Sequence, residues 1–270
     1  MAKLTGERPM EGHTPDSLLA LHDAGYREVI TRLGSGRVLD VGCGVGMETA
    51  RFCAPNRRVV GVDYDAATAA HARHDFGPDG PRGTDAEFVT MDGARLGFAS
   101  GSFDAVCSSH IIEHFVMPET HVAELARVCT DDGATFVITP NAPADFENPF
   151  HVYLFEAEQL ASLLRLFFAD VQIIGLEGDA VLKDDFAARR ASGEKLLKFD
   201  VLKLRQRMPR SWYVWSYEHA LPVAYKALGS KNTGVGSGLD DSHFFATDEI
   251  APTTPVLFAI ARSPRRFPPR

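Results

Sequence analysis

The chain has 270 residues, of which 45% are hydrophobic and 24% charged, and its formal net charge is -8. This length fits one large globular domain or two small ones. The excess of 36 Asp and Glu over 28 Lys and Arg argues against a surface built to neutralise phosphates, so we expect no nucleic-acid partner. No uncharged apolar run approaches the roughly 18 residues of a membrane-spanning helix, and residues 1–8 lack the apolar stretch of a secretory signal. The four cysteines form no C-x-x-C pair, and we expect a cytoplasmic protein without a cysteine-bound zinc ion.

The pattern of apolar residues predicts a helix first and then an α/β sheet. Helical spacing of apolar side chains predicts a helix over residues 16–33. From residue 37 onward, short β-branched runs alternate with helical stretches, which is typical of a parallel sheet with crossover helices. We expect a second amphipathic helix over residues 156–168. The expected strands cover residues 37–41, 59–62, 87–91, 103–108, 134–139, 171–175 and 256–262.

About 80 residues between the last two strands exceed what such a sheet needs. We interpret residues 177–250 as a helical insertion. Its central part, residues 183–231, has eleven Lys and Arg against five Asp and Glu, a local balance of +6. We expect the insertion to form the substrate-facing wall. A lid, a dimer arm and a surface that rests on membrane headgroups stay open as interpretations.

A glycine-rich loop is the most informative segment of the chain. The sequence VLDVGCGVG at residues 38–46 joins an apolar strand to three glycines at alternate positions. Glycine permits a tight turn there and lets a ligand approach the backbone. The dinucleotide fingerprint G-x-G-x-x-G would need its third glycine at position 47, where this chain has Met47. A nicotinamide-dependent oxidoreductase is therefore the less favoured interpretation.

Two acidic residues follow at the ends of the next two strands. Asp63 ends the second strand, in GVDYD, and Asp92 ends the third, in FVTMDGA. Ligands of open α/β sheets bind at the carboxyl ends of the strands, and an acid about 20 residues beyond the glycine loop can accept hydrogen bonds from ribose hydroxyls. The loop and the two acids together indicate a nucleoside-binding pocket.

Residues 38–139 resemble the class I S-adenosylmethionine-dependent methyltransferases in the motifs VLDVGCGVG, GVDYD, MDGARLGFASGSFDAVCSSHIIEHF and GATFVITPN. The resemblance implies a Rossmann-like, seven-stranded sheet with helices on both faces and the helical insertion before the last strand. It divides the chain into an N-terminal helical cap (1–36), a cofactor-binding core (37–176), the insertion (177–250) and the last strand with a tail (251–270). The residues that the resemblance assigns to S-adenosylmethionine are Asp40, Gly42 and Gly44 for the methionine part, Asp63 for the ribose, Asp92 and Gly93 for the adenine, and Ser108 and Ser109 beside the methyl group. Tyr64 is a further candidate for cofactor binding.

Four residues are candidates for the base that removes a proton from the methyl acceptor. They are His110, Glu113 and His114 after the fourth strand, and His151 after the fifth. The N-P-P-Y loop of methyltransferases that act on adenine or glutamine is absent after the fourth strand, and so is the Pro-Cys pair of cytosine methyltransferases. Small molecules and glycans remain as acceptors.

The motifs LTGER, TPN, NPFH and DDS resemble actinobacterial methyltransferases that O-methylate sugars. We therefore expect O-methylation, with N-methylation of a small molecule as the alternative. A divalent cation stays open, because Glu113, His114, His151, Asp240, Asp241 and His243 are suitable ligand types without a diagnostic spacing. A homodimer also stays open.

Overall fold

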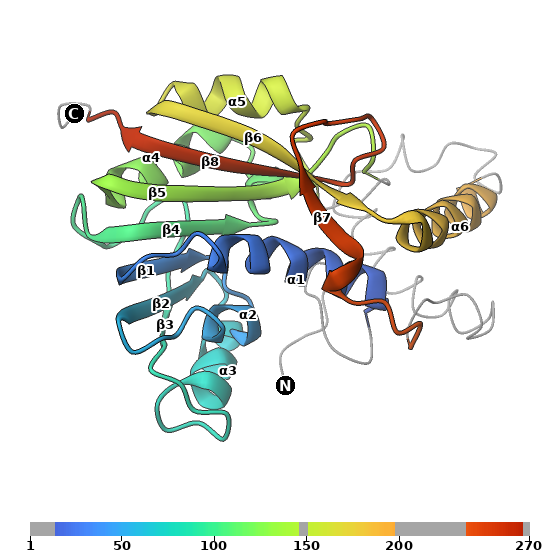
Figure 1. Cartoon of the computed structure of the whole chain (residues 1–270). Helices are drawn as coiled ribbons and strands as arrows, with labels where there is room; N and C mark the ends of the chain where they lie inside the picture. The colour runs from blue at the N-terminus through green and yellow to red at the C-terminus, as the bar shows by residue number, and fades with distance from the viewer. Residues whose placement is uncertain (1–13, 146–150, 198–235, 267–270) are drawn as a thin grey trace.

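The computed structural model of the chain describes residues 14–145, 151–197 and 236–266, and they are arranged around one sheet (Figure 1). The strand order is β3-β2-β1-β4-β5-β8-β6-β7. The first five strands pair in parallel, whereas β8 is antiparallel to both of its neighbours and β7 is antiparallel to β6. The strands are β1 (Gly36–Val41), β2 (Arg57–Asp63), β3 (Glu87–Thr90), β4 (Phe103–Ser109), β5 (Cys129–Pro140), β6 (Phe168–Gly178), β7 (Phe244–Thr247) and β8 (Val256–Pro264).

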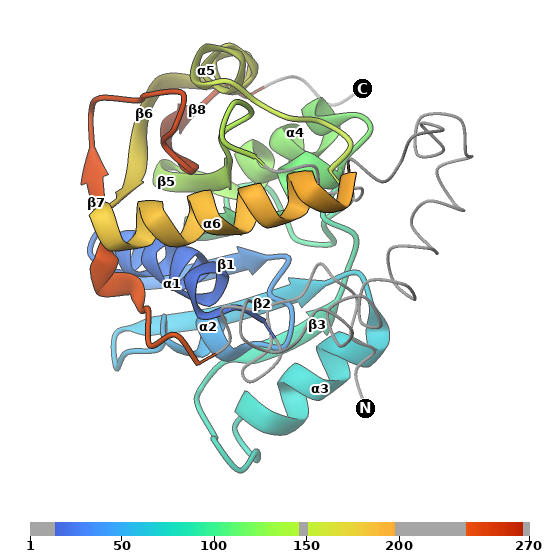
Figure 2. The same ribbon diagram turned by 90° about the vertical axis from the view of Figure 1, so that its right-hand side faces the viewer.

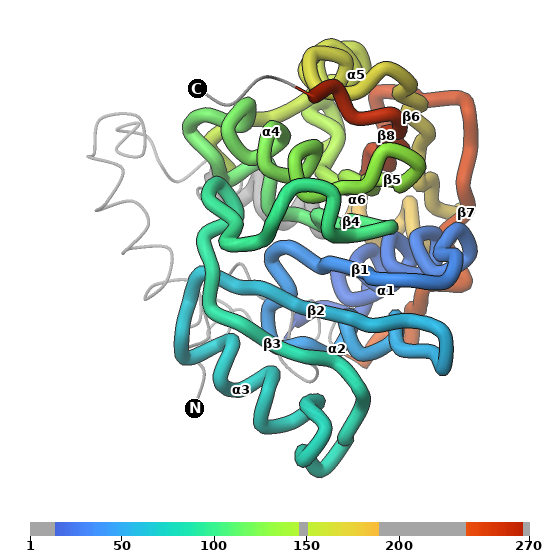
Figure 3. The backbone as a smooth tube through the Cα atoms, turned by 90° about the vertical axis from the view of Figure 1, so that its left-hand side faces the viewer, coloured from blue at the N-terminus to red at the C-terminus, as the bar shows by residue number. Residues whose placement is uncertain are grey.

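Helices cover both faces of this sheet, and each face has its own apolar cluster. Side chains of α1 and α3 belong to one cluster, and side chains of α4 and α5 belong to the other. Figure 3 shows α3 beside β3 at one end of the sheet and α5 beside β6 toward the other. The helices are α1 (Asp16–Ile30), α2 (Met47–Ala50), α3 (Ala66–Phe76), α4 (Pro118–Val128), α5 (Ala157–Arg165) and α6 (Ala180–Leu197), with 3-10 turns η1 (Ile112–His114) and η3 (Asp241–His243).

The central strands are buried on both faces, which explains their nearly continuous apolar sequences. Four residues of β1, from Val38 to Val41, are buried, and so are the first six of β8. The arrowheads of β4 and β5 point to the right in Figure 1, and Figure 2 turns this side toward the viewer, where α6 runs across the edge of the sheet. The first part of the expected insertion therefore lies over the edge at which ligands bind in folds of this kind.

The prediction of a Rossmann-like sheet with helices on both faces is confirmed, but the described residues form eight strands, not seven. The additional strand, β7, lies within the segment expected to be helical and pairs with the outer side of β6. Its four residues are too few for a recognisable alternating pattern, and the pairing of Gly178 with Phe244 joins segments 66 residues apart. Most of the basic stretch at 183–231 lies outside the described residues.

None of the described helices is long and apolar enough to cross a membrane.

Candidate cofactor and acceptor site

A cavity of about 390 Å³ opens at the carboxyl edge of the parallel strands. Its walls come from α1, the loop after β1, and the ends of β2, β3 and β4. Nine of the thirteen residues predicted for the site line it, namely Gly42, Gly44, Asp63, Tyr64, Asp92, Gly93, Ser109, His110 and His114. The other four, Asp40, Ser108, Glu113 and His151, lie outside the lining.

The glycine loop turns beneath the cavity in a conformation that only glycine adopts easily. Gly42, Gly44 and Gly46 have φ angles of 82°, 54° and 85°. A Cβ atom on Gly42 would lie 2.4 Å from Cγ2 of Ile111, and one on Gly46 would lie 2.8 Å from the ring of Phe88. A Cβ atom on Gly44 would meet nothing within 4 Å. The third glycine therefore stands at position 46 because the backbone there packs against Phe88.

Asp63 joins the glycine loop to the end of β2. Its Oδ2 accepts a hydrogen bond from the Gly44 amide at 3.1 Å, and its Oδ1 accepts one from the Asp65 amide at 2.9 Å. The side chain is nearly buried, whereas the next residue, Tyr64, is 73% exposed on the cavity rim. The carboxylate is thus fixed in direction at the point where a ribose would lie in folds of this kind.

Asp40 lies beneath the loop and is completely buried. The Tyr26 hydroxyl donates to its two oxygens at 3.1 and 3.2 Å, and Thr49 Oγ1 donates to Oδ2 at 2.5 Å. Burial raises the pKa of Asp40 to about 6, and the hydrogen bonds from Thr49 and Tyr26 oppose that rise. Tyr26 also lines the cavity, so Asp40 fixes the position of a tyrosine hydroxyl in the cavity wall.

His121 holds the wall near Gly93. Its Nδ1 lies 2.9 Å from the Gly93 carbonyl oxygen and its Nε2 lies 2.9 Å from Ser108 Oγ. Burial lowers the pKa of His121 to about 4, so the ring is neutral near pH 7. Because the carbonyl only accepts, Nδ1 carries the proton and Nε2 accepts from Ser108. The predicted cofactor residue Ser108 is therefore a buried partner of His121 behind the wall.

Histidines and one buried carboxylate gather at the end of β4. His110 adopts a left-handed conformation with φ 54°, and its Nδ1 lies 3.7 Å from Glu113 Oε1. Glu113 is 1% exposed, and its Oε2 accepts a hydrogen bond from Thr139 at 3.0 Å. Burial acts to raise the pKa of Glu113, but His110 and the other nearby histidines outweigh it and lower the pKa to about 2. A buried carboxylate whose ionised form is favoured by the neighbouring histidines thus lies behind the cavity wall.

His114 and His151 complete this group. Their rings pack edge to face with centroids 5.3 Å apart, and His151 Nδ1 lies 2.8 Å from Asp145 Oδ2. His114 lines the cavity, whereas His151 does not. The structure therefore brings together all four residues predicted as candidate bases, and His110 and His114 are the two that reach the cavity.

Comparison with known proteins identifies the family. Residues 39–137 match the Methyltransferase domain family. The chain is 32% identical over 189 residues to the probable S-adenosylmethionine-dependent methyltransferase Rv3030 of Mycobacterium tuberculosis, covering 67% of this chain and 66% of that protein, just under two thirds of its length. Residues 39–137 therefore form a domain of the class I S-adenosylmethionine-dependent methyltransferases.

Two further similarities involve methyltransferases of different types. The O-methyltransferase cnsE of Penicillium expansum is 30% identical over 153 residues, which cover 52% of this chain and 55% of the fungal protein. A solved structure of Haemonchus contortus phosphoethanolamine N-methyltransferase 2 with S-adenosyl-L-methionine has a TM-score of 0.52 at 17% identity, and the match covers 93% of this chain and 54% of that one. The second similarity concerns the fold alone.

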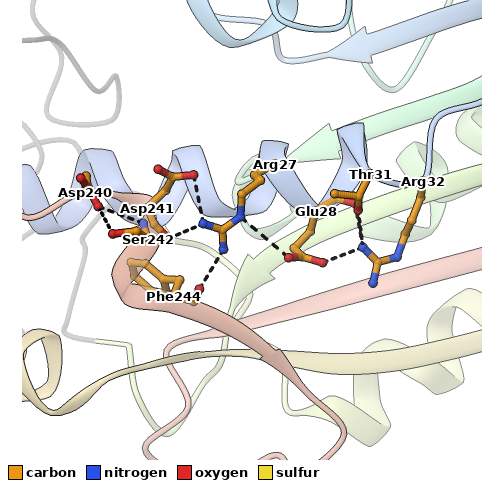
Figure 4. Close-up of polar contacts among 8 residues, drawn as sticks. All are labelled: Arg27, Glu28, Thr31, Arg32, Asp240, Asp241, Ser242 and Phe244. Atoms are coloured by element: carbon orange, nitrogen blue, oxygen red, sulfur yellow. Dashed lines mark hydrogen bonds and ion pairs between the residues drawn. The ribbon is translucent and has the colours of Figure 1, made fainter.

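Three of the residues considered as metal ligands make structural contacts instead, namely Asp240, Asp241 and His243. Figure 4 shows the contacts of Asp240 and Asp241. Asp241 forms an ion pair of 3.1 Å with Arg27 of α1, and Arg27 also donates to the carbonyl oxygens of Asp241 and Phe244. His243 Nδ1 lies 2.8 Å from Asp179, and Asp240 caps η3. The metal-capable cluster found in the described part of the chain contains Glu113, His114 and His151 only.

The residues predicted from the sequence did not include His22, Tyr26 or His121, which also take part in the site. His22 and Tyr26 line the cavity from successive turns of α1, and the ring of His22 lies 4.3 Å from that of His110. His121 supports the wall from α4. The i, i+4 spacing of His22 and Tyr26 was the available signal, because it puts both side chains on one face of the helix.

Proposed function

We propose that this methyltransferase binds S-adenosylmethionine in the cavity and transfers its methyl group to a hydroxyl of a small molecule or sugar. The proposal rests on the presence of both acidic residues and histidines in the lining of one cavity. Asp63 and Asp92 provide an acidic wall that suits a cationic cofactor, and His110 and His114 lie beside them. The acceptor and the methyl group would then meet next to imidazoles.

The cofactor contacts follow from the lining. In this proposal the Gly42 and Gly44 backbone receives the methionine part, Asp63 and Tyr64 hold the ribose, and Asp92 with Gly93 reads the adenine. Ser109 supports the placement of the reactive end beside β4, because its buried hydroxyl lines the cavity and has no hydrogen-bond partner among the described residues. Asp40 and Ser108 would act through Tyr26 and His121, which hold the walls.

The reaction is an in-line displacement. The acceptor oxygen attacks the methyl carbon, the carbon–sulfur bond breaks, and its electron pair neutralises the sulfonium. The hydroxyl proton passes to a base, for which we propose His110. Its Nε2 is buried without a hydrogen-bond partner among the described residues, and Nδ1 faces ionised Glu113. A positioned base typically contributes about 10²-fold to 10⁴-fold to such a reaction.

We also propose that residues 177–250 form the substrate-facing wall. The position of α6 across the carboxyl edge of the parallel strands supports this assignment (Figure 2). Deletion of residues 183–231 should spare cofactor binding and abolish transfer. Intact transfer after the deletion would refute it.

The test is a transfer assay with S-adenosylmethionine labelled in its methyl group. Sugars, phenols and amines of matched size serve as acceptors, and calorimetry compares S-adenosylmethionine with NAD. Label on a hydroxyl would support the proposal, and label on amines alone would replace it with N-methylation. Binding of NAD in preference to S-adenosylmethionine would overturn it.

A further inference from the structure

We propose that Glu113, His114 and His151 bind one divalent transition-metal ion at the acceptor side of the cavity. Each residue offers one ligand atom, and all three atoms lie within 4.8 Å of one another. Ligands about 2.1 Å from a tetrahedral ion lie about 3.4 Å apart, so modest side-chain rotation closes the cluster around an ion. The role given to the ion rests on the proposed function, whereas the site itself rests on these three residues.

Backbone hydrogen bonds link the two segments that supply the ligands. The amides of Val152 and Tyr153 both donate to the carbonyl oxygen of Glu113, at 2.8 and 3.0 Å. These bonds hold the residue after His151 against the turn that contains Glu113 and His114. The spacing of the ligands is therefore set by two hydrogen bonds between segments about 40 residues apart in sequence.

A second set of contacts orients the ligand atoms. Nδ1 of His151 lies 2.8 Å from Asp145 Oδ2, so His151 would bind the ion through Nε2. Thr139 takes Oε2 of Glu113, whereas Oε1 is buried and accepts no hydrogen bond from the described residues. Histidine ligands of metal ions almost always donate their second nitrogen to a carboxylate, a carbonyl or water, and the Asp145–His151 pair has this arrangement.

The chemistry of the donors selects the class of ion. Two imidazoles and one carboxylate suit Zn²⁺, Co²⁺, Fe²⁺ or Mn²⁺, whereas Mg²⁺ and Ca²⁺ prefer oxygen ligands. Three protein ligands leave at least one coordination position open. Because His114 also lines the cavity, that position is available to the acceptor. One carboxylate against a double positive charge leaves the site cationic, which favours an acceptor oxygen that is losing its proton.

Binding of Co²⁺ provides a test that does not depend on activity. Tag-free protein is dialysed against a chelator and titrated with Co²⁺, followed by visible absorption, and with Zn²⁺, followed by calorimetry. We expect one ion per chain in the wild type. Glu113→Gln and His151→Ala should each weaken binding at least tenfold, and Asp145→Asn should weaken it about 10-fold to 100-fold. His74→Ala is the matched control, since His74 is an exposed histidine that also contacts an aspartate.

The outcomes separate the metal site from the proposed function. S-adenosylmethionine affinity is measured for every variant as a control for folding. A wild type that binds no ion, or variants that bind it as tightly as the wild type, would overturn the metal site even if methyl transfer persists. One ion per chain that is lost in the variants would support the site even if no hydroxyl acceptor is methylated.

Discussion

Replacement of Gly46 by alanine should destabilise the fold more than the same replacement of Gly44. Both residues have positive φ angles, 85° and 54°, and an L-residue in that conformation costs about 1–2 kcal/mol. At position 44 the new methyl group meets nothing within 4 Å, so this is the whole expected cost. At position 46 the methyl group would lie 2.8 Å from both Ala72 and the Phe88 ring, and overpacking of a buried site adds about 1–3 kcal/mol.

The assay is urea unfolding followed by circular dichroism. Gly46→Ala should lose about 2–5 kcal/mol of unfolding free energy and Gly44→Ala about 1–2 kcal/mol. Cofactor affinity should show the opposite order, because the methyl group at position 44 projects into the cavity that we assign to S-adenosylmethionine. Equal losses of stability, or a larger loss at Gly44, would refute the assignment of the third glycine to packing against Phe88.

Three more predictions concern the walls of the cavity and the contacts of α1. Asp63→Asn should weaken binding of S-adenosylmethionine by about 10-fold to 100-fold in calorimetry, because it removes charge-assisted hydrogen bonds worth about 1.5–3 kcal/mol; the exposed Asp85→Asn serves as control, and an unchanged affinity would exclude the ribose role. Asp40 has a pKa of about 6 in the folded state against an ordinary value of 3.8, so between these pH values the folded state holds a proton on Asp40 that the unfolded state has lost. The free energy of unfolding should therefore fall by about 3 kcal/mol as the pH rises from about 4 to 6. Urea unfolding of the wild type and Asp40→Asn across this range should give a stability difference that changes with pH, and parallel curves would contradict the raised pKa. Arg27→Met should cost about 2 kcal/mol, since it removes the bonds to Asp241 and Phe244, whereas the control Arg165→Met, whose ion pair with Glu158 stays within α5, should cost less than about 1 kcal/mol; equal costs in the same unfolding assay would argue against the contact between α1 and η3.

The cavity could largely be predicted because its residues follow strands in a regular order. Each parallel strand ends at the same edge, so the loop after β1, Asp63 and Asp92 had to lie near one another once the strands were recognised. Which of the strand residues face the cavity could not be predicted in the same way. Asp40 and Ser108 belong to strands buried on both faces, where a continuous apolar pattern gives no sign of side-chain direction.

The candidate residues on the proposed acceptor side could be named from the sequence, but their positions relative to one another could not be predicted. Asp240, Asp241 and His243 have the same ligand chemistry as the residues near Glu113, but the structure gives them partners in α1 and at Asp179. The contribution of α1 to the cavity, through His22, depends on how that helix packs on the sheet. The i, i+4 spacing of His22 and Tyr26 puts the two side chains on one face of α1, but it does not show that this face contacts the cavity.

The sequence by itself determined the family of the domain, the sheet and the strand-end residues that line the cavity, because these depend on local patterns: glycines where the backbone turns, acids where strands end, and apolar runs in between. Only the tertiary structure decided which histidines meet. His110, Glu113 and His114 are neighbours in the chain, but His151 joins them through backbone hydrogen bonds from Val152 and Tyr153 to Glu113. Contacts of that kind depend on the path of the intervening chain, and residue type alone does not encode that path.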